Sequence, residues 1–417
     1  MSRVVIIGAG QAGASLAIKL RGLGHEGPIT LIGSEEALPY QRPPLSKKYL
    51  LGEMEVERLH LRPRSFYEER RIELRPGVAV TSIDRAGKTV TLDDGTSLPY
   101  DQLALTTGAE PLRLPARLGG ELPGTYTVRT LRDVDAMAPE FVEGRRVLIV
   151  GGGYIGLEAA AVAASRGLQV TLVEMAERIL QRVAAPETST YFRELHRGHG
   201  VDIREGVGVA SLAGEGRVAT AALSDGTTLA TDFVVVGVGV RPATGLAEAA
   251  GLAIENGIRV DAHGRTTDPS IFAAGDCTSF PYRGQRVRLE SVPNAIDQAE
   301  AAAASMLGSG KDYEARPWFW SDQYDVKLQI AGLNAGYDRT VVRPGARAGA
   351  LSVWYYRGSE LLAVDAMNDP RSYMTGKRWI EGGFSPPPAV VGDPQCDLKT
   401  LAAPGSPGAV PATPRGG

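Results

Sequence analysis

The chain contains little cysteine for its size: Cys277 and Cys396 are the two cysteines among 417 residues. They lie far apart and belong to no Cys-x-x-Cys motif. This scarcity argues against a disulfide framework and favours a reducing environment. We therefore expect a cytoplasmic protein.

Long apolar runs and an excess of one charge are also lacking. No stretch reaches the roughly 18–20 unbroken apolar residues that a membrane span needs. Met1 is followed by a strand-like run rather than by a basic, apolar signal segment. The 45 lysines and arginines are nearly balanced by 48 acidic residues. These absences predict no membrane association and no nucleic-acid partner.

Glycine, in contrast, is placed in two related strings, Gly8-Ala-Gly-Gln-Ala-Gly13 and Gly151-Gly-Gly-Tyr-Ile-Gly156. Each follows an apolar β-branched run and leads into an alanine-rich helical pattern. In such a string the first glycine allows a tight turn, the second lets the backbone approach a pyrophosphate, and the third allows close helix–strand packing. The N-terminus of the helix then offers N–H groups to the phosphates. The sequence therefore predicts that one chain binds two dinucleotides.

The two strings head similar strand–helix–strand units, which indicates an internal duplication. The first is expected over 3–7, 11–23 and 29–33, and the second over 146–150, 154–166 and 169–173. Short alternating runs predict hairpins near 78–98 and near Asp225-Gly226. The predicted fold is α/β, with two Rossmann-like, glutathione-reductase-type domains and a C-terminal α+β domain.

The C-terminal domain is expected because the composition changes near residue 317. All four tryptophans follow this point, among predicted strands at 325–331, 351–356 and 361–367 and a helix near 370–380. Residues 402–417 are rich in proline, alanine and glycine, and predict a disordered tail.

An acidic residue follows the second strand of each unit, where a carboxylate can bind ribose hydroxyls. In the first unit this is Glu35, with Glu36 as a competitor. In the second it is Glu174, which would repel a 2′-phosphate and so favours NADH over NADPH. Arg178 and Arg182 follow, either to neutralise a pyrophosphate or as ordinary surface arginines.

Three further positions carry candidate chemistry. In the loop Arg42-Pro-Pro-Leu-Ser-Lys47 two prolines stiffen the backbone, Arg42 can pair with pyrophosphate, and Lys47 can place a cation near a flavin. Glu158 lies in an apolar helix, and a buried carboxylate requires a partner, for which Lys47 is the candidate. Asp276 ends a strand at the edge where such sheets bind ligands, and can accept hydrogen bonds from a ribityl chain.

Taken in order, eight strings resemble the oxygenase-coupled, FAD-dependent ferredoxin reductases over roughly residues 3–400. After the first glycine string they are RPPLSK at 42–47, TTGAEP at 106–111, GGGYIGLE at 151–158, VGVGVRP at 236–242, FAAGDC at 272–277, ESVPNAIDQA at 290–299 and WFWSDQY at 318–324. Ser34 departs from the pattern, because many members carry an acid there.

The resemblance implies an FAD domain formed by 1–112 and 241–316, an NADH domain at 113–240 and a C-terminal domain at 317–401. It implies Lys47, Glu158 and Trp320 as residues of the reaction centre, with Glu158 on the nicotinamide side. The cofactor-binding positions are expected at Gly8, Gly10, Ala12, Gly13, Glu35, Arg42, Lys47, Thr107, Gly108, Gly275, Asp276, Glu290, Val292 and Trp320 for FAD, and at Gly151, Gly153, Tyr154, Ile155, Gly156, Glu158, Glu174, Arg182 and Gly239 for NADH.

The implied activity is electron transfer from NADH through FAD to a [2Fe–2S] ferredoxin, which serves a cytochrome P450 or a Rieske oxygenase. A flavin disulfide reductase would need a cysteine near the flavin, and none precedes Cys277, which is better interpreted as a packing residue. A flavoprotein like apoptosis-inducing factor, a rubredoxin reductase and a quinone reductase remain alternatives.

Arginines indicate where an acidic ferredoxin could dock. One cluster consists of Arg62, Arg64, Arg70 and Arg71, and the other of Arg283, Arg286 and Arg288. Most such runs of charge are simply solvated surface, which is the alternative interpretation of both clusters.

Overall fold

The structure is a computed structural model that describes residues 2–401. The tail expected at 402–417 lies outside the described residues. The chain divides into two compact units. Unit 1 contains residues 1–112, 129–131 and 239–315, and unit 2 contains 113–128, 132–238 and the residues from 316 onward.

The centre of unit 1 is a parallel sheet in the order β19-β7-β1-β2-β3. Its strands are β1 (Val4–Ile7), β2 (Ile29–Gly33), β3 (Ile72–Pro76), β7 (Gln102–Leu105) and β19 (Ile271–Ala273), and helix α1 (Gln11–Gly22) connects β1 to β2. Every residue of β1 and β2 is buried, as expected for a parallel sheet that is covered on both faces.

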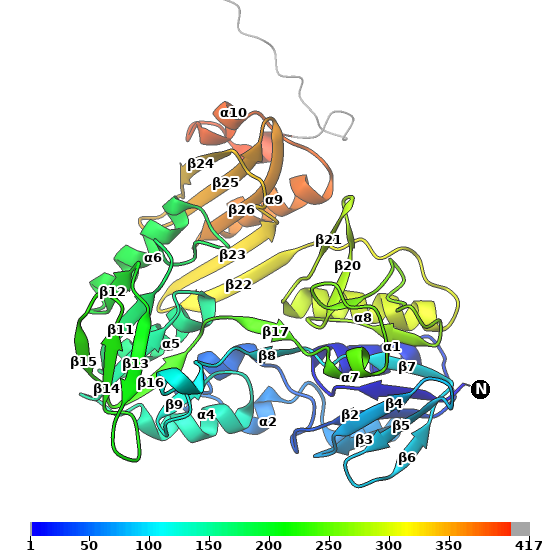
Figure 1. Cartoon of the computed structure of the whole chain (residues 1–417). Helices are drawn as coiled ribbons and strands as arrows, with labels where there is room; N and C mark the ends of the chain where they lie inside the picture. The colour runs from blue at the N-terminus through cyan, green and yellow to red at the C-terminus, as the bar shows by residue number, and fades with distance from the viewer. Residues whose placement is uncertain (1, 402–417) are drawn as a thin grey trace, which may run out of the picture. The chain divides into compact units, whose positions relative to one another are not determined.

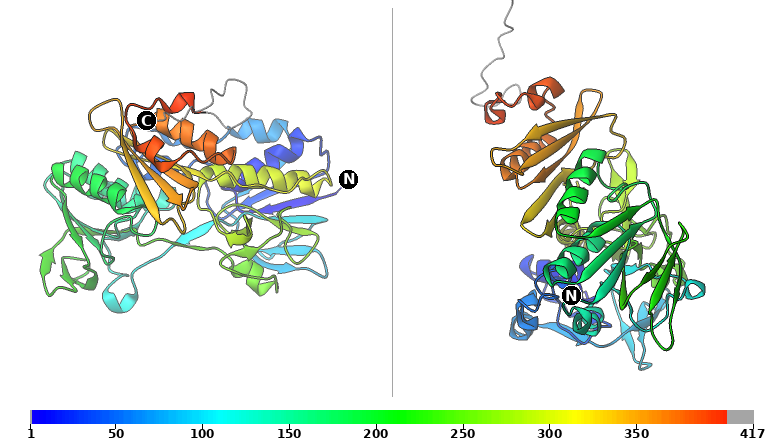
Figure 2. Two further views of the ribbon diagram at one scale, coloured as in Figure 1. Left: turned by 90° about the horizontal axis from the view of Figure 1, so that it is seen from above. Right: turned by 90° about the vertical axis from the view of Figure 1, so that its left-hand side faces the viewer.

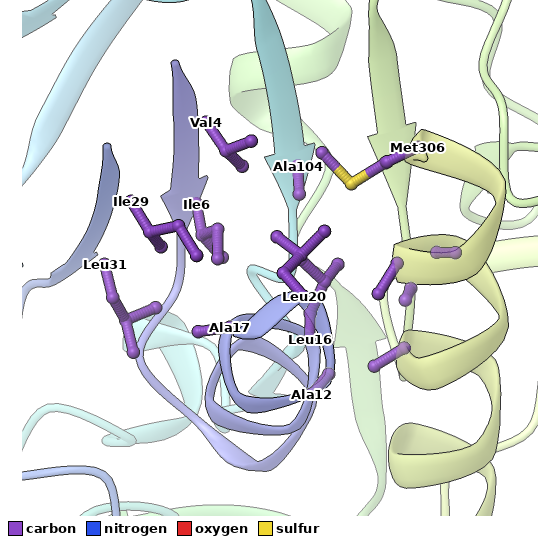
Figure 3. Close-up of a cluster of buried hydrophobic side chains, with 14 of the residues drawn as sticks. Val4, Ile6, Ala12, Leu16, Ala17, Leu20, Ile29, Leu31, Ala104 and Met306 are labelled. Carbon is purple, nitrogen blue, oxygen red and sulfur yellow. The ribbon is translucent and has the colours of Figure 1, made fainter. Parts of the chain in front are cut away.

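The core beneath this sheet joins segments that are far apart in the sequence. Helix α8 (Val292–Met306) packs along α1, and alanines on the facing side of α8 allow the two helices to lie close together. Figure 3 shows Leu16 and Leu20 of α1 pointing between the sheet and Met306. Helix α8 was not predicted from the sequence, although its Gln298 accepts a hydrogen bond from Gly275 just beyond β19.

Unit 2 repeats the plan with a parallel sheet in the order β12-β11-β10-β16-β9 (Figure 1). The strands are β9 (Thr125–Thr127), β10 (Arg146–Val150), β11 (Gln169–Glu174), β12 (Asp202–Glu205) and β16 (Phe233–Val236), with helices α5 (Tyr154–Ser165) and α6 (Pro186–Gly198). The expected duplication of the strand–helix–strand unit is therefore confirmed.

Each unit also carries an antiparallel three-stranded sheet at the predicted hairpins. The first comprises β4 (Val80–Asp84), β5 (Thr89–Leu92) and β6 (Ser97–Pro99), and the second β13 (Val209–Ala213), β14 (Thr220–Leu223) and β15 (Thr228–Ala230).

The C-terminal part of unit 2 is a five-stranded antiparallel sheet with helix α9 (Pro370–Glu381) along one face (Figure 2). The strand order is β22 (Trp318–Gln323), β23 (Val326–Gly332), β26 (Glu360–Met367), β25 (Leu351–Arg357) and β24 (Arg339–Pro344). The three predicted strands and the helix are present, whereas β22 and β24 were not predicted.

The remaining elements are short: α2 (Val56–Leu59), α3 (Arg64–Glu69), β8 (Ala109–Pro111), α4 (Leu131–Met137), β17 (Val240–Pro242), α7 (Gly245–Ala249), β18 (Ile258–Arg259), β20 (Thr278–Tyr282), β21 (Gln285–Val287), α10 (Pro388–Gly392) and the 3-10 turns at Pro43–Ser46, Ala116–Leu118, Ala138–Glu140 and Leu398–Thr400. Among residues 2–401, none of the helices has the length and apolarity needed to cross a bilayer.

Candidate functional site

The first glycine loop lies between β1 and α1 in unit 1. A Cβ atom at Gly8, whose φ is +109°, would collide with the carbonyl oxygen of Thr106, and one at Gly13 would collide with the carbonyl oxygen of Gly8. A Cβ at Gly10 would meet no described heavy atom within 4 Å. The outer glycines are thus required by the fold, whereas the middle one borders open space above the helix N-terminus.

The second loop, between β10 and α5 in unit 2, repeats this arrangement. Gly151 has a φ of +107° and faces the carbonyl oxygen of Gly237, and a Cβ at Gly156 would collide with the carbonyl oxygen of Gly151. At Gly153 the nearest described atom, the oxygen of Gly237, would be 4.0 Å from an added Cβ. Both loops therefore leave room where a pyrophosphate binds at a helix N-terminus.

The acid of the first unit, Glu35, belongs to an ion-paired network. Arg42 Nη2 donates to Glu35 Oε1 at 2.6 Å, and the Tyr40 hydroxyl donates to Glu35 Oε2 at 2.5 Å. Arg42 Nη1 also donates to the Tyr40 hydroxyl and to the carbonyl oxygen of Arg129. The partner of Arg42 within unit 1 is thus Glu35, and the competitor Glu36 is exposed.

Asp276 lies three residues beyond the end of the buried strand β19 and faces Arg129, with 3.4 Å between Oδ2 and Nη2. Burial raises the pKa of this carboxyl, and Arg129 opposes the rise only in part. The same burial, together with Arg42, lowers the pKa of Arg129. Arg129 was missed by the sequence analysis because it lies in no motif and inside the stretch expected to bind NADH.

The other expected FAD positions surround this pair or end nearby elements of unit 1. Thr107 donates to the carbonyl oxygen of Ala243 at 2.6 Å, and Gly108, with φ +71°, lies next to the Arg129 guanidinium. The N–H of Gly275 donates to Gln298 Oε1, and the Cβ of Ala12 packs against Gly275.

Three more expected positions lie at the ends of other segments of unit 1. Lys47 follows the 3-10 turn Pro43–Ser46, and Val292 begins α8. Glu290 is exposed and forms an ion pair with Arg288.

The acid of the second unit is held by backbone groups. Glu174 Oε2 accepts from the N–H of Gly152 at 2.7 Å, and Oε1 accepts from the N–H of Ala176 at 2.8 Å. Met175, the next residue, is 82% exposed. Arg182 is exposed, and Arg178 donates to Ser189, so the local partner of Arg178 is a hydroxyl. The acid is therefore pre-oriented beside the glycine loop.

Glu158 projects from α5 and is only 3% exposed. Its Oε1 accepts a 2.6 Å hydrogen bond from Ser321 of β22, a partner that sequence reasoning missed. Lys47 lies in unit 1, so its expected pairing with Glu158 stays a prediction. Because Ser321 belongs to WFWSDQY, that string could have signalled a role beyond Trp320.

Of the remaining expected positions, Tyr154, Ile155 and Trp320 belong to unit 2, whereas Gly239 belongs to unit 1. At the start of α5, the Tyr154 ring packs against Phe319 and Ile155 is 42% exposed. Gly239, with φ +108°, accepts a hydrogen bond from the N–H of Leu112 within unit 1. Trp320, in β22, stacks on Trp318.

Cys277 is fully buried, and its thiol lies within hydrogen-bond distance of the carbonyl oxygens of Leu105 and Ala274. Burial raises the pKa of this thiol, which disfavours the reactive thiolate. The interpretation of Cys277 as a packing residue agrees with this environment.

Comparisons with known proteins cover nearly the whole chain. Residues 2–299 match the pyridine nucleotide-disulphide oxidoreductase family, and residues 318–402 match the reductase C-terminal family. The ferredoxin–NAD(P)(+) reductase fdr of a Sphingomonas species is 45% identical over 96% of this chain and 98% of its own. Putidaredoxin reductase CamA of Pseudomonas putida is 42% identical over 96% of both chains.

Solved structures agree with the sequence relatives. The reductase in the covalent putidaredoxin reductase–putidaredoxin complex has a TM-score of 0.92 and 41% identity, over 95% of this chain and 97% of that one. The ferredoxin reductase for the CYP199A2 system of Rhodopseudomonas palustris has a TM-score of 0.93 and 41% identity, over 97% of this chain and 100% of that one. The chain therefore belongs to the pyridine nucleotide-disulphide oxidoreductase family and, within it, to the ferredoxin reductases.

Proposed function

We propose that this protein is an FAD-dependent NADH:ferredoxin oxidoreductase that supplies a cytochrome P450 or an aromatic-ring oxygenase through a [2Fe–2S] ferredoxin. The observation that carries the proposal is the pair of glycine loops, one in each unit, each with open space at its middle glycine. The family uses FAD and NAD(P)H, and close relatives are named as ferredoxin and putidaredoxin reductases.

We assign FAD to unit 1 and NADH to unit 2. The glycine loop at Gly8–Gly13 would hold the FAD pyrophosphate, with Arg42 and Arg129 supplying positive charge nearby. Asp276, just beyond the carboxyl end of the edge strand β19, would accept hydrogen bonds from the ribityl chain. The domain bounds 1–112 with 241–316, 113–240 and 317–401 belong to this assignment.

Bound FAD would supply the chemistry that no side chain offers, taking a hydride from NADH and passing electrons singly to an iron–sulfur acceptor. The protein's part is orientation and charge. Lys47 is proposed to stabilise negative charge on the reduced ring, and Glu158 and Trp320 to lie at the nicotinamide and ring ends of the site. Glu174 would bind the adenosine ribose and disfavour a 2′-phosphate, so NADH is the expected donor.

For the ferredoxin we propose the surface formed by Arg62, Arg64, Arg70 and Arg71. All four are exposed, and Arg62 and Arg70 flank the Phe66 ring at 5.3 and 3.8 Å from its centroid. In the second cluster, Arg286 pairs with Glu255 and Arg288 pairs with Glu290, which lowers its net positive field. If this surface steers an acidic ferredoxin, the rate of ferredoxin reduction should fall steeply with added salt.

We also propose a cytoplasmic location, supported by the two free cysteines, of which one is fully buried. A flavoprotein that resembles apoptosis-inducing factor remains the second candidate because it shares the two dinucleotide sites.

The test compares acceptors. Purified holoprotein is mixed with NADH and with [2Fe–2S] ferredoxins, rubredoxin, a quinone or oxygen, and turnover is measured for each. The proposal expects ferredoxin to be reduced fastest. Comparable, slow turnover with every acceptor would favour the second candidate and overturn the proposal.

A further inference from the structure

A continuous chain of four hydrogen bonds reaches Glu158 through unit 2. Tyr324 OH lies 3.2 Å from His196 Nδ1, and His196 Nε2 lies 2.8 Å from Gln323 Oε1. Gln323 Nε2 lies 3.2 Å from Ser321 Oγ, which lies 2.6 Å from Glu158 Oε1. Ser321 and Gln323 come from β22, Tyr324 directly follows that strand, and His196 comes from α6.

The direction of this chain follows from the chemistry of its members. The amide oxygen of Gln323 can only accept, so His196 Nε2 carries the proton, and Nδ1 of the neutral ring must accept from the Tyr324 hydroxyl. The amide nitrogen of Gln323 can only donate to Ser321, which then gives its own proton to Glu158. Every bond therefore points toward the carboxylate, and the polarisation of successive bonds adds up.

Burial keeps this chain intact. His196 and Ser321 have no exposed surface, and Gln323 and Glu158 are 1% and 3% exposed. Burial also lowers the pKa of His196 to about 4, so the ring is neutral at pH 7. Water therefore does not compete for these groups, and each partner holds the next in one geometry.

The backbone at the outer end of the chain is strained. Tyr324 has a φ of +53° in the two-residue connection between β22 and β23, a conformation that glycine or asparagine adopts at lower cost. Its ring stacks on His199 at 3.6 Å between centroids with 10° between planes. A bulky side chain kept in this conformation suggests that its hydroxyl is needed.

We propose that Ser321, Gln323, His196 and Tyr324 are positioning residues that hold Glu158 as a fixed hydrogen-bond acceptor for the carboxamide of the nicotinamide of NADH. The proposal rests on the proposed function, which assigns the nicotinamide to Glu158. An ionised carboxylate only accepts hydrogen bonds, and a carboxamide presents N–H donors. By engaging Oε1, Ser321 restricts rotation of the carboxylate.

Stopped-flow reduction of the holoprotein by NADH under anaerobic conditions tests this inference. Ser321→Ala should lower the limiting rate of flavin reduction about 10- to 100-fold, because misorientation of a reacting group has effects of this size. The half-saturating NADH concentration should change much less, because the adenosine and pyrophosphate contacts remain. The matched control is Ser352→Ala, which removes another fully buried hydroxyl of the same sheet that is not bonded to Glu158.

Two comparisons separate positioning from simple packing. In a Glu158→Gln background, Ser321→Ala should lower the rate of flavin reduction little further, because the carboxylate that Ser321 positions is no longer present. Tyr324→Asn relieves the backbone strain and removes the hydroxyl, whereas Tyr324→Phe removes the hydroxyl alone. Both variants should be folded, and NADH should reduce their flavin about threefold more slowly than that of wild type. Tyr324→Asn should be at least as stable as Tyr324→Phe, because asparagine adopts this backbone conformation at lower cost.

Wild-type rates in both Ser321→Ala and Tyr324→Phe would overturn the positioning role while leaving the proposed function intact. An equally large loss from Ser321→Ala in the Glu158→Gln background would also overturn it. A yellow wild-type protein that NADH does not reduce would overturn the proposed function, and this inference with it.

Discussion

The two dinucleotide loops have nearly the same backbone, but their surroundings differ. In unit 1 the acid Glu35 is bound by the guanidinium of Arg42, and a second ion pair joins Arg129 to Asp276. In unit 2 the acid Glu174 accepts two backbone N–H groups, and Glu158 is held by a neutral hydroxyl. The acid that follows the first loop is held by a charged side chain, and the acid that follows the second loop is held by backbone N–H groups.

This difference fits two ligands with different lifetimes on the protein. A carboxylate that its own loop has already oriented lowers the cost of each binding event, which matters for a ligand that enters at every turnover. Fixed cations suit a group that carries two phosphates and stays bound. The duplicated fold thus supports one resident and one exchanging dinucleotide.

The largest effect should come from filling the two open spaces separately. Gly10→Val should give a folded but colourless protein, because the side chain occupies the proposed pyrophosphate space of unit 1. Gly153→Val should stay yellow and lose NADH affinity by about 100-fold or more. FAD content and NADH titration measure both outcomes.

Gly22→Ala is the control, because its Cβ also meets no described atom but lies at the far end of α1. Loss of FAD from Gly153→Val, with FAD retained in Gly10→Val, would reverse the assignment of the two sites.

Two buried titratable side chains of unit 2, His196 and Asp365, predict opposing pH effects on stability. The pKa of His196 falls from 6.5 to about 4 on folding because the ring is buried. Between these values the unfolded state binds more protons, so the His196 contribution to stability is lost as pH falls. Burial raises the pKa of Asp365 from 3.8 to about 7, so its contribution falls as pH rises through that window.

Replacing either residue alone should therefore change how the free energy of unfolding depends on pH between about pH 4 and 6.5, and the two changes should be opposite in sign. In Asp365→Asn the free energy of unfolding, measured relative to wild type, should rise by roughly 3 kcal/mol as pH increases across this window. In His196→Gln the same difference should fall by a similar amount. Urea unfolding followed by tryptophan fluorescence measures this, because all four tryptophans lie in unit 2. An unchanged dependence of the unfolding free energy on pH in both variants would contradict the burial of His196 and Asp365 in their neutral forms.

A smaller effect is expected at the ion pair of unit 1. Arg129→Ala leaves the Asp276 carboxyl without its cation, which should raise its pKa further and weaken FAD binding about tenfold. Arg129→Lys should recover part of the affinity. NADH affinity should not change in holoprotein. If NADH affinity fell while FAD stayed bound, Arg129 would belong to the other site.

The smallest effect concerns the choice of donor in unit 2. Glu174→Gln keeps an acceptor for the N–H of Gly152 but removes the negative charge. The ratio of kcat/KM for NADH to that for NADPH should fall about fivefold to tenfold. The same substitution at Glu35 should leave the ratio unchanged. A ratio unaffected by Glu174→Gln would show that another group selects the donor.

Local pattern was sufficient for the duplicated units. The spacing of Gly8, Gly10 and Gly13 and the adjoining buried strand specify a turn and a helix within a few residues, so both units were predicted. The strand β22 was missed because its sequence WFWSDQ shows no clean alternation, and its burial depends on neighbouring strands.

Non-local contacts account for what was missed in the site. Arg129 reaches Asp276 across 147 positions, and Ser321 reaches Glu158 across 163. No local periodicity encodes such pairs, because tertiary packing alone brings them together. The sequence indicated Asp276 and Glu158 as candidates but not the groups that hold them.

Anaerobic titration of the purified protein with NADH tests the central claim most directly. We predict a yellow protein whose flavin absorbance is bleached by about one equivalent of NADH and recovers when about two equivalents of oxidised [2Fe–2S] ferredoxin are added. A colourless protein, or a flavin that stays oxidised with excess NADH, would contradict the account.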